Sequence, residues 1–235
     1  MHTCRTMFHF WKRGNGISIA ARPTQDSQRS TGSSTASSGW FISASRTSCS
    51  AGGPWRSSAG CWAQRWLRRC RARLPAPVPA TGICYAEGLA KGLGKPMVNA
   101  LEKLHRPNNR TLCFADVERR TGLIRDHLKL TGEDLQGKQV VVVDEAIFTG
   151  TTLRIVCQML REAGAAKVHI AIPTPMSNCR CAQYVLPAMP SLADSMPPSK
   201  MLDYFGADSL TYIPGQSFLE IARPSGAVCT DCFEA

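Results

Sequence analysis

VVVVDEAIFTGTT, residues 140–152, is the stretch of sequence that decides the fold. Its four consecutive valines are β-branched and apolar, as expected of a strand that is buried on both faces. Two carboxylates follow, then a short loop with a glycine and hydroxyl side chains, and then a helix. Such a loop points unpaired backbone N–H groups at one spot, where the positive end of the helix adds to them. The stretch therefore predicts a phosphate site at the carboxyl end of a strand.

The residues after this loop continue the pattern of an α/β protein. Apolar residues recur at helical spacing from Thr151 to Ala163, and Gly164 stands where a helix end is expected. Residues 168–172 then have the composition of a second strand. A strand, a helix and a strand in succession form a βαβ unit, which makes the sheet parallel and the crossover right-handed. Ligands of open parallel sheets bind outside the carboxyl ends of the strands, where the loop lies.

The acidic pair Asp144–Glu145 suggests a ribose 5-phosphate as the ligand. Two adjacent carboxylates can accept hydrogen bonds from the 2- and 3-hydroxyls of a ribose while the loop binds the phosphate. Carboxylates after a strand also occur in dehydrogenases, receiver domains and Walker B strands, so the pair alone is not specific. A Walker A loop is excluded because no Gly-Lys-Ser/Thr follows the glycine. The hydroxyl loop and the helix at this offset favour the phosphoribosyl site.

This combination resembles the phosphoribosylpyrophosphate (PRPP) motif of type I phosphoribosyltransferases. The resemblance implies an α/β fold with a parallel sheet flanked by helices. It also implies that the two carboxylates bind the ribose hydroxyls, as the catalytic residues, and that the hydroxyl loop binds the 5-phosphate. The implied PRPP-binding residues of the motif are Asp144, Glu145, Ala146, Thr149, Gly150, Thr151 and Thr152.

Other segments resemble the amidophosphoribosyltransferase branch of this family, and the resemblance runs from about residue 75 to the end of the chain. The similar segments are residues 82–86, 159–165, 206–210 and 229–233. Members of this branch make 5-phosphoribosylamine from PRPP with Mg²⁺, which is the first step of purine synthesis. The resemblance therefore implies a transferase whose substrates are PRPP and ammonia.

Two loops depart from the pattern of the family. The pyrophosphate loop reads Pro79-Ala80-Thr81-Gly82, which lacks the family's acidic residue at Ala80 but keeps a hydroxyl at Thr81. The resemblance implies that Thr81 contacts Mg²⁺ together with Asp144 and Glu145. Of the loop that closes over PRPP, only Arg110 and the threonine after it can be placed. These departures leave two alternatives open, a non-catalytic PRPP-binding module and an inactive truncated product.

Composition divides the chain into two parts. Residues 1–80 hold 12 Lys/Arg and one acidic residue, whereas residues 81–235 hold 16 of each, so the net charge of +11 comes from the first part. A basic charge confined in this way does not indicate nucleic-acid binding by the second part. We expect residues 1–74 to be a basic, disordered segment and residues 75–235 to form the phosphoribosyltransferase domain.

Three interpretations of residues 1–74 compete. The segment could be a disordered basic tail, an organellar transit peptide, or non-native translation such as a frameshift in a GC-rich gene. We favour the third, because five scattered tryptophans fit a tail poorly and the glutaminase domain of the family is not recognisable there. We therefore expect activity with ammonia at best. We expect no membrane helix, because no apolar run of about 18 residues occurs.

The 11 cysteines are an odd number, which argues against a complete disulfide framework. A nucleotide enzyme with a parallel sheet is expected in a reducing compartment, here the cytoplasm. Some members of the resembled family carry a [4Fe–4S] cluster. The resemblance places three of its ligands at Cys181, Cys229 and Cys232, and the fourth in the region that is not recognisable here. We therefore expect an incomplete cluster. The sequence leaves homo-oligomerisation open.

Overall fold

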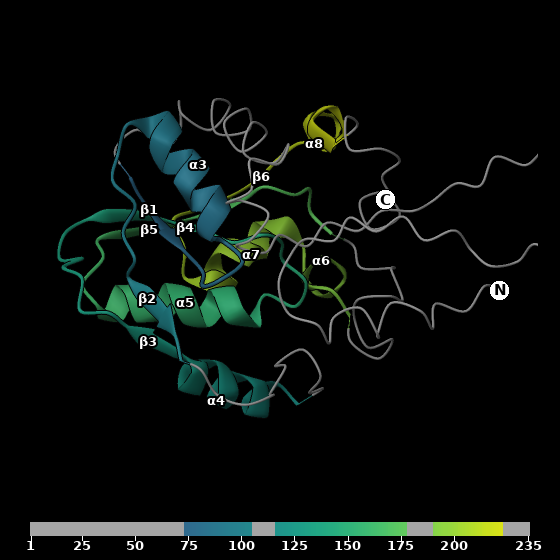
Figure 1. Cartoon of the computed structure of the whole chain (residues 1–235). Coiled ribbons are helices and arrows are strands. Elements are labelled where there is room, and N and C mark those ends of the chain that lie inside the picture. Colours follow the sequence, from purple (N-terminus) through teal and green to yellow (C-terminus); the bar gives the residue numbers. More distant parts are fainter. Residues whose placement is uncertain (1–72, 105–115, 178–189, 223–235) are drawn as a thin grey trace, which may run out of the picture.

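The computed structural model describes residues 73–104, 116–177 and 190–222 (Figure 1). Its main sheet has the strand order β1-β4-β5-β6, and each neighbouring pair is parallel. The strands are β1 (Leu74–Pro77), β4 (Gln139–Val143), β5 (Lys167–Ile172) and β6 (Ser209–Tyr212). The parallel α/β architecture inferred from the sequence is therefore confirmed.

The strand β4 occupies an internal position of this sheet, and its four valines are completely buried. The helix α3 (Ile83–Leu93) covers one face of the sheet and α5 (Thr151–Glu162) covers the other (Figure 1). Val140 and Val142 belong to the apolar core that α5 helps to form. Because successive side chains of a strand point to opposite faces, a strand between two helical layers needs apolar residues at every position. The run of valines meets that need.

The helix α5 begins after Gly150 and ends at Glu162, and β5 follows at Lys167. Both agree with the helix and the second strand expected from the sequence. The buried side chains Leu153, Val156 and Leu160 lie on one side of α5, at the spacing of an amphipathic helix. The βαβ unit that carries the site is therefore present as expected.

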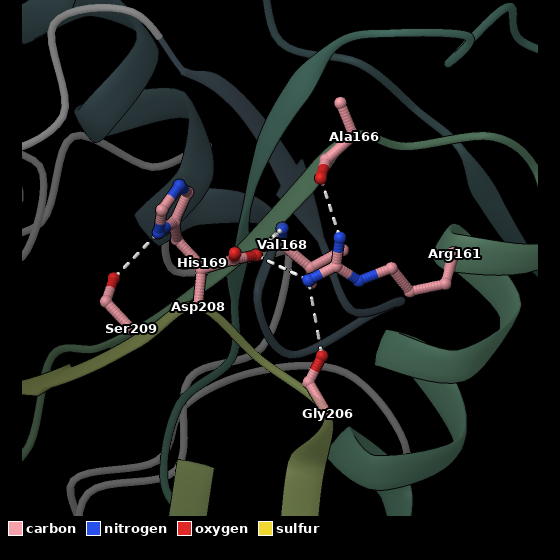
Figure 2. A network of polar contacts seen from close by, with 7 residues as sticks. All are labelled: Arg161, Ala166, Val168, His169, Gly206, Asp208 and Ser209. Atoms are coloured by element: carbon pink, nitrogen blue, oxygen red, sulfur yellow. Dashed lines mark hydrogen bonds and ion pairs between the residues drawn. The ribbon is translucent and has the colours of Figure 1, made fainter. Parts of the chain in front are cut away.

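A polar network joins the carboxyl end of α5 to the amino ends of β5 and β6 (Figure 2). The guanidinium of Arg161 donates to the carbonyl of Ala166 at 2.7 Å and to the carboxylate of Asp208. The same carboxylate accepts the backbone N–H of Val168 at 2.8 Å. Beside it, Nδ1 of His169 lies 2.8 Å from the hydroxyl of Ser209. The network fixes the end of α5 that lies away from the hydroxyl loop.

The other elements surround this unit. The helix α4 (Val117–His127) packs against α5, on the side away from the sheet (Figure 1). Two short antiparallel strands, β2 (Leu101–Lys103) and β3 (Leu128–Leu130), form a separate sheet. The remaining helices are α6 (Leu192–Ser195), α7 (Pro198–Phe205) and α8 (Gly215–Ala222). None of the helices in the described ranges is long and apolar enough to cross a membrane.

Candidate functional site

The acidic pair lies at the carboxyl end of β4. Asp144 follows the strand directly and is only 8% exposed. Its Oδ1 atom accepts a hydrogen bond of 2.8 Å from the hydroxyl of Thr81 and one of 2.9 Å from the backbone N–H of Glu145. Glu145 is partly buried, and its Oε2 atom is buried without a hydrogen-bond partner among the described residues. The orientation of Asp144 is thus fixed, while Glu145 keeps an acceptor for a ligand.

Gly82 allows the turn after β1 to lie against the end of β4. The backbone N–H of Val78 donates to the carbonyl of Val143 at 2.9 Å, and that of Gly82 donates to the carbonyl of Val78. A Cβ atom on Gly82 would stand 2.0 Å from the carbonyl oxygen of Val143, so no other residue fits without moving backbone. This close approach brings Thr81 to Asp144, 63 residues further along the chain.

The hydroxyl loop ends at the amino end of α5. Gly150 has a φ of +75°, which favours glycine, and a Cβ atom there would lie 3.0 Å from Leu192 and 3.1 Å from Phe205. No side chain of the described residues caps the helix, so within this part of the chain the N–H groups of its first turn have no side-chain acceptor. The hydroxyls of Thr149 and Thr151 lie 3.3 Å apart beside them. Backbone donors and hydroxyls therefore gather at one helix end.

The structure brings several of the candidate residues together and leaves others undescribed. Thr81, Asp144 and Glu145 lie at the carboxyl ends of β1 and β4. Ala146, Thr149 and Gly150 belong to the loop between β4 and α5, and Thr151 and Thr152 begin α5. The candidates outside the described residues are Arg110, Cys181, Cys229 and Cys232.

Two residues near the pair were not singled out from the sequence. The hydroxyl of Thr174, just after β5, donates to the backbone carbonyl of Glu145 at 3.0 Å. Lys103, at the end of β2, lowers the pKa of the Glu145 carboxyl through its positive charge. Thr174 could have been found, because the carboxyl ends of neighbouring parallel strands meet at one edge of the sheet. Lys103 carries no such signal, since β2 lies in the other sheet.

Burial governs the electrostatics of the pair. It raises the pKa of Asp144 to about 6, although the hydrogen bonds from Thr81 and from the Glu145 N–H act in the opposite direction. Burial and, to a smaller extent, the neighbouring charge of Asp144 raise the pKa of Glu145 to about 8, although the hydrogen bond from Thr81 and the charge of Lys103 act in the opposite direction. A buried carboxyl pair of this kind favours ligands that bring hydroxyl donors or positive charge.

The stability of the ligand-free protein should depend on pH because of this pair. The folded state keeps protons that the unfolded chain has released above about pH 4. The free energy of unfolding should therefore fall as the pH rises through the folded pKa values of about 6 and about 8.

In the double variant Asp144→Asn, Glu145→Gln we expect most of this fall to disappear and the thermal midpoint at pH 8.5 to rise by about 2–4 °C or more. Thermal unfolding followed by circular dichroism from pH 5 to pH 9 measures it, and an unchanged pH dependence in the double variant would contradict it.

Comparisons with known proteins show a similarity to phosphoribosyltransferases. Residues 76–179 match the family of the phosphoribosyl transferase domain. An amidophosphoribosyltransferase of Synechococcus elongatus is 34% identical over 159 residues, which cover 66% of this chain and 32% of that protein. One of Archaeoglobus fulgidus is 33% identical over 153 residues, which cover 63% of this chain and 33% of that protein. The chain therefore spans about a third of the length of these relatives.

Solved structures show the same likeness. The glutamine PRPP amidotransferase from B. subtilis, complexed with ADP and GMP, is 28% identical to this chain with a TM-score of 0.62. The alignment covers 76% of this chain and 41% of that one. The resemblance seen in the sequence is thus confirmed for fold and family. Residues 76–179 match the phosphoribosyl transferase domain family, and the similar proteins reported above are amidophosphoribosyltransferases.

Proposed function

We propose that this chain binds PRPP at the carboxyl ends of β1 and β4 and transfers its phosphoribosyl group to ammonia, forming 5-phosphoribosylamine. The observation that carries the proposal is the pair Asp144–Glu145 beside the start of α5. Among the described residues, the Oε2 atom of Glu145 has no hydrogen-bond partner and no side chain caps the helix. The names of the relatives, which are amidophosphoribosyltransferases, support the choice of reaction. The product would enter purine synthesis.

Each part of PRPP has a chemically suited partner. The carboxylates of Asp144 and Glu145 would accept hydrogen bonds from the two ribose hydroxyls, and such charge-assisted bonds are stronger than neutral ones. The N–H groups of the first turn of α5 would bind the 5-phosphate, helped by the positive end of the helix. The loop of residues 146–150 and the hydroxyls of Thr151 and Thr152 would complete the phosphate site.

The oxygen atoms of the site fit a magnesium ion. Mg²⁺ prefers carboxylate, hydroxyl and phosphate oxygens and usually takes only one or two carboxylates from a protein. The site offers Asp144, Glu145 and the hydroxyl of Thr81. The described residues contain no group of three His, Cys, Asp or Glu side chains that could hold a metal by themselves, which agrees with an ion held largely by its substrate. When bound, Mg²⁺ would offset the charge of the leaving pyrophosphate.

The protein's part in the reaction is to position and to stabilise charge. The bond between C1 of the ribose and pyrophosphate breaks as C1 gains oxocarbenium character, as in glycoside cleavage. The carboxylates of Asp144 and Glu145 would hold the ribose while positive charge develops beside them. The lone pair of ammonia then forms the C1–N bond, and the product amine loses a proton to solvent. None of the described residues needs to act as a general base.

The nucleophile can be tested directly. We expect the 235-residue chain to release pyrophosphate from PRPP and Mg²⁺ when ammonium is supplied at high pH, and not when glutamine is supplied, because nothing in residues 1–74 resembles a glutaminase domain. A coupled pyrophosphate assay measures both rates, with the Asp144→Asn, Glu145→Gln variant as the inactive control. Turnover with glutamine would refute the ammonia proposal.

A second function follows if PRPP binds but neither nucleophile supports pyrophosphate release. The chain would then be a non-catalytic PRPP-binding module. The sequence of the pyrophosphate loop favours this alternative, since Ala80 stands where the family has an acidic residue. Binding of PRPP without release of pyrophosphate would support the non-catalytic module over the enzyme.

The cysteines bear on location and on an iron–sulfur cluster. Cys157 is a free thiol, which supports our proposal of a reducing, cytoplasmic location. Burial raises the pKa of Cys157 to about 12, so this residue is unsuited to act as a thiolate ligand. We propose that cluster binding, where it occurs, rests on the three cysteines 181, 229 and 232, which lie outside the described residues.

A further inference from the structure

The main chain of Glu145 is fixed at both of its polar groups, whereas one oxygen of its carboxylate has no hydrogen-bond partner among the described residues. Its N–H donates to Oδ1 of Asp144 at 2.9 Å, and its carbonyl accepts from the hydroxyl of Thr174 at 3.0 Å. Its carboxylate oxygen Oε2 has no partner among the described residues. This residue is therefore held through its backbone, and the Oε2 atom of its carboxylate remains for a ligand.

Thr174 makes its contact just beyond the end of the sheet. The pairing of β4 with both of its neighbours ends at Val143, opposite Pro77 on β1 and Ala171 on β5. Glu145 lies two residues further on, so no ladder hydrogen bond fixes it. The hydroxyl of Thr174 thus provides a hydrogen bond to the main chain where the chain leaves β4 and strand pairing no longer does so.

The surroundings of this hydrogen bond make its loss costly. Thr174 is only 9% exposed, so water has little access to the hydroxyl. Removing the hydroxyl of Thr174 would take this hydrogen bond from the carbonyl of Glu145, which lies at a partly buried position. A buried acceptor that has lost its donor is unfavourable. The peptide after Glu145 would turn to find another donor, and the Cα–Cβ direction of Glu145 would change with it.

We infer that Thr174 is a positioning residue, which sets the carboxylate of Glu145 toward the ribose hydroxyls without touching the substrate itself. The inference rests on the proposed function, because it assigns the carboxylate a ribose as its ligand. A displaced carboxylate forms weaker hydrogen bonds, and misplacement by about 1 Å can cost up to about 100-fold in rate.

The test compares three variants at the level of PRPP binding. Thr174→Val keeps the shape of the side chain and removes the donor, and we expect it to weaken PRPP binding in the presence of Mg²⁺ by about tenfold. Thr174→Ser keeps the hydroxyl and should restore most of the affinity. Thr131→Val is the matched control, because Thr131 donates to the carbonyl of Asn99 at 2.7 Å in an exposed position. Isothermal titration calorimetry of the full chain measures all three.

A second measurement separates positioning from a general loss of structure. If Thr174 acts through Glu145, then Thr174→Val should change affinity less than about twofold once Glu145→Gln is present, since coupled residues are not additive. An equal tenfold loss in both backgrounds would overturn the inference, as would an unchanged affinity of Thr174→Val in the parent chain. Absence of PRPP binding by the parent chain would instead overturn the proposed function, and this inference with it.

Discussion

Replacing Asp144 by asparagine and Glu145 by glutamine together should weaken PRPP binding by at least about 100-fold. Each carboxylate would lose a charge-assisted hydrogen bond to a ribose hydroxyl, and such bonds contribute about 1.5–3 kcal/mol each. The fold should survive, because the pair is buried and its raised pKa values show that the charged forms are unfavourable in the ligand-free protein. Calorimetry with PRPP and Mg²⁺ measures the affinity.

A matched control exists on the same chain. Glu133 and Asp134 are also adjacent acidic residues, but both are exposed and lie before β4. The variant Glu133→Gln, Asp134→Asn removes the same charge and breaks an exposed ion pair with Lys138, which contributes little to stability. The asparagine keeps an oxygen that can still accept the backbone N–H of Gln136. We expect PRPP binding to be unchanged in it. Equal affinity in the two double variants would show that the site has been assigned to the wrong carboxylates.

Replacing Gly82 by alanine should disrupt both the fold around the site and the binding of PRPP. The new Cβ atom would stand 2.0 Å from the carbonyl oxygen of Val143 and 2.9 Å from the backbone nitrogen of Val78, and neither atom can move without the main chain. The hydrogen bond between these two residues would be lost, and Thr81 would move away from Asp144. We expect the free energy of unfolding to fall by about 2 kcal/mol or more.

A change from glycine to alanine at Gly122 should affect the free energy of unfolding in the opposite direction. Gly122 lies inside α4, and a Cβ atom there would meet nothing within 4 Å. Gly122→Ala should therefore raise the free energy of unfolding by up to about 1 kcal/mol, since glycine is unfavourable inside a helix. Chemical denaturation and PRPP calorimetry of both variants check the pair of expectations. An unaltered stability of Gly82→Ala would mean that the turn after β1 can shift freely.

The sequence was most informative where a single segment carries its own pattern. The valines of β4 and the periodic apolar residues of α5 each define an element by local spacing, and the structure has both within one or two residues of the expected positions. The strand β1 was not expected, because Pro75 and Pro77 lie within it and proline removes a ladder hydrogen bond. Its place at the edge of the sheet makes those prolines acceptable.

The sequence likewise predicted the parts of the site that are contiguous in the chain, but not the contacts between distant positions. Asp144, Glu145 and the hydroxyl loop follow one another in the sequence, so their proximity needs no tertiary information. The hydrogen bond from Thr81 to Asp144 joins positions 63 residues apart, and that from Thr174 to Glu145 joins positions 29 apart. Both depend on which strands flank β4. Neither the order of the strands nor the end of the strand pairing at Val143, two residues before Glu145, could be read from the sequence.

The two ends of α5 serve different purposes. Arg161 and its partners Asp208 and Ala166 lie at the amino ends of the strands (Figure 2). The acidic pair lies at the carboxyl end of β4. The helix between them has 12 residues and is therefore about 18 Å long. Substitutions at sites that far apart usually act independently. Directed evolution could therefore improve the thermal tolerance of this domain through the Arg161 network without the loss of activity that often accompanies stabilising changes near a binding site.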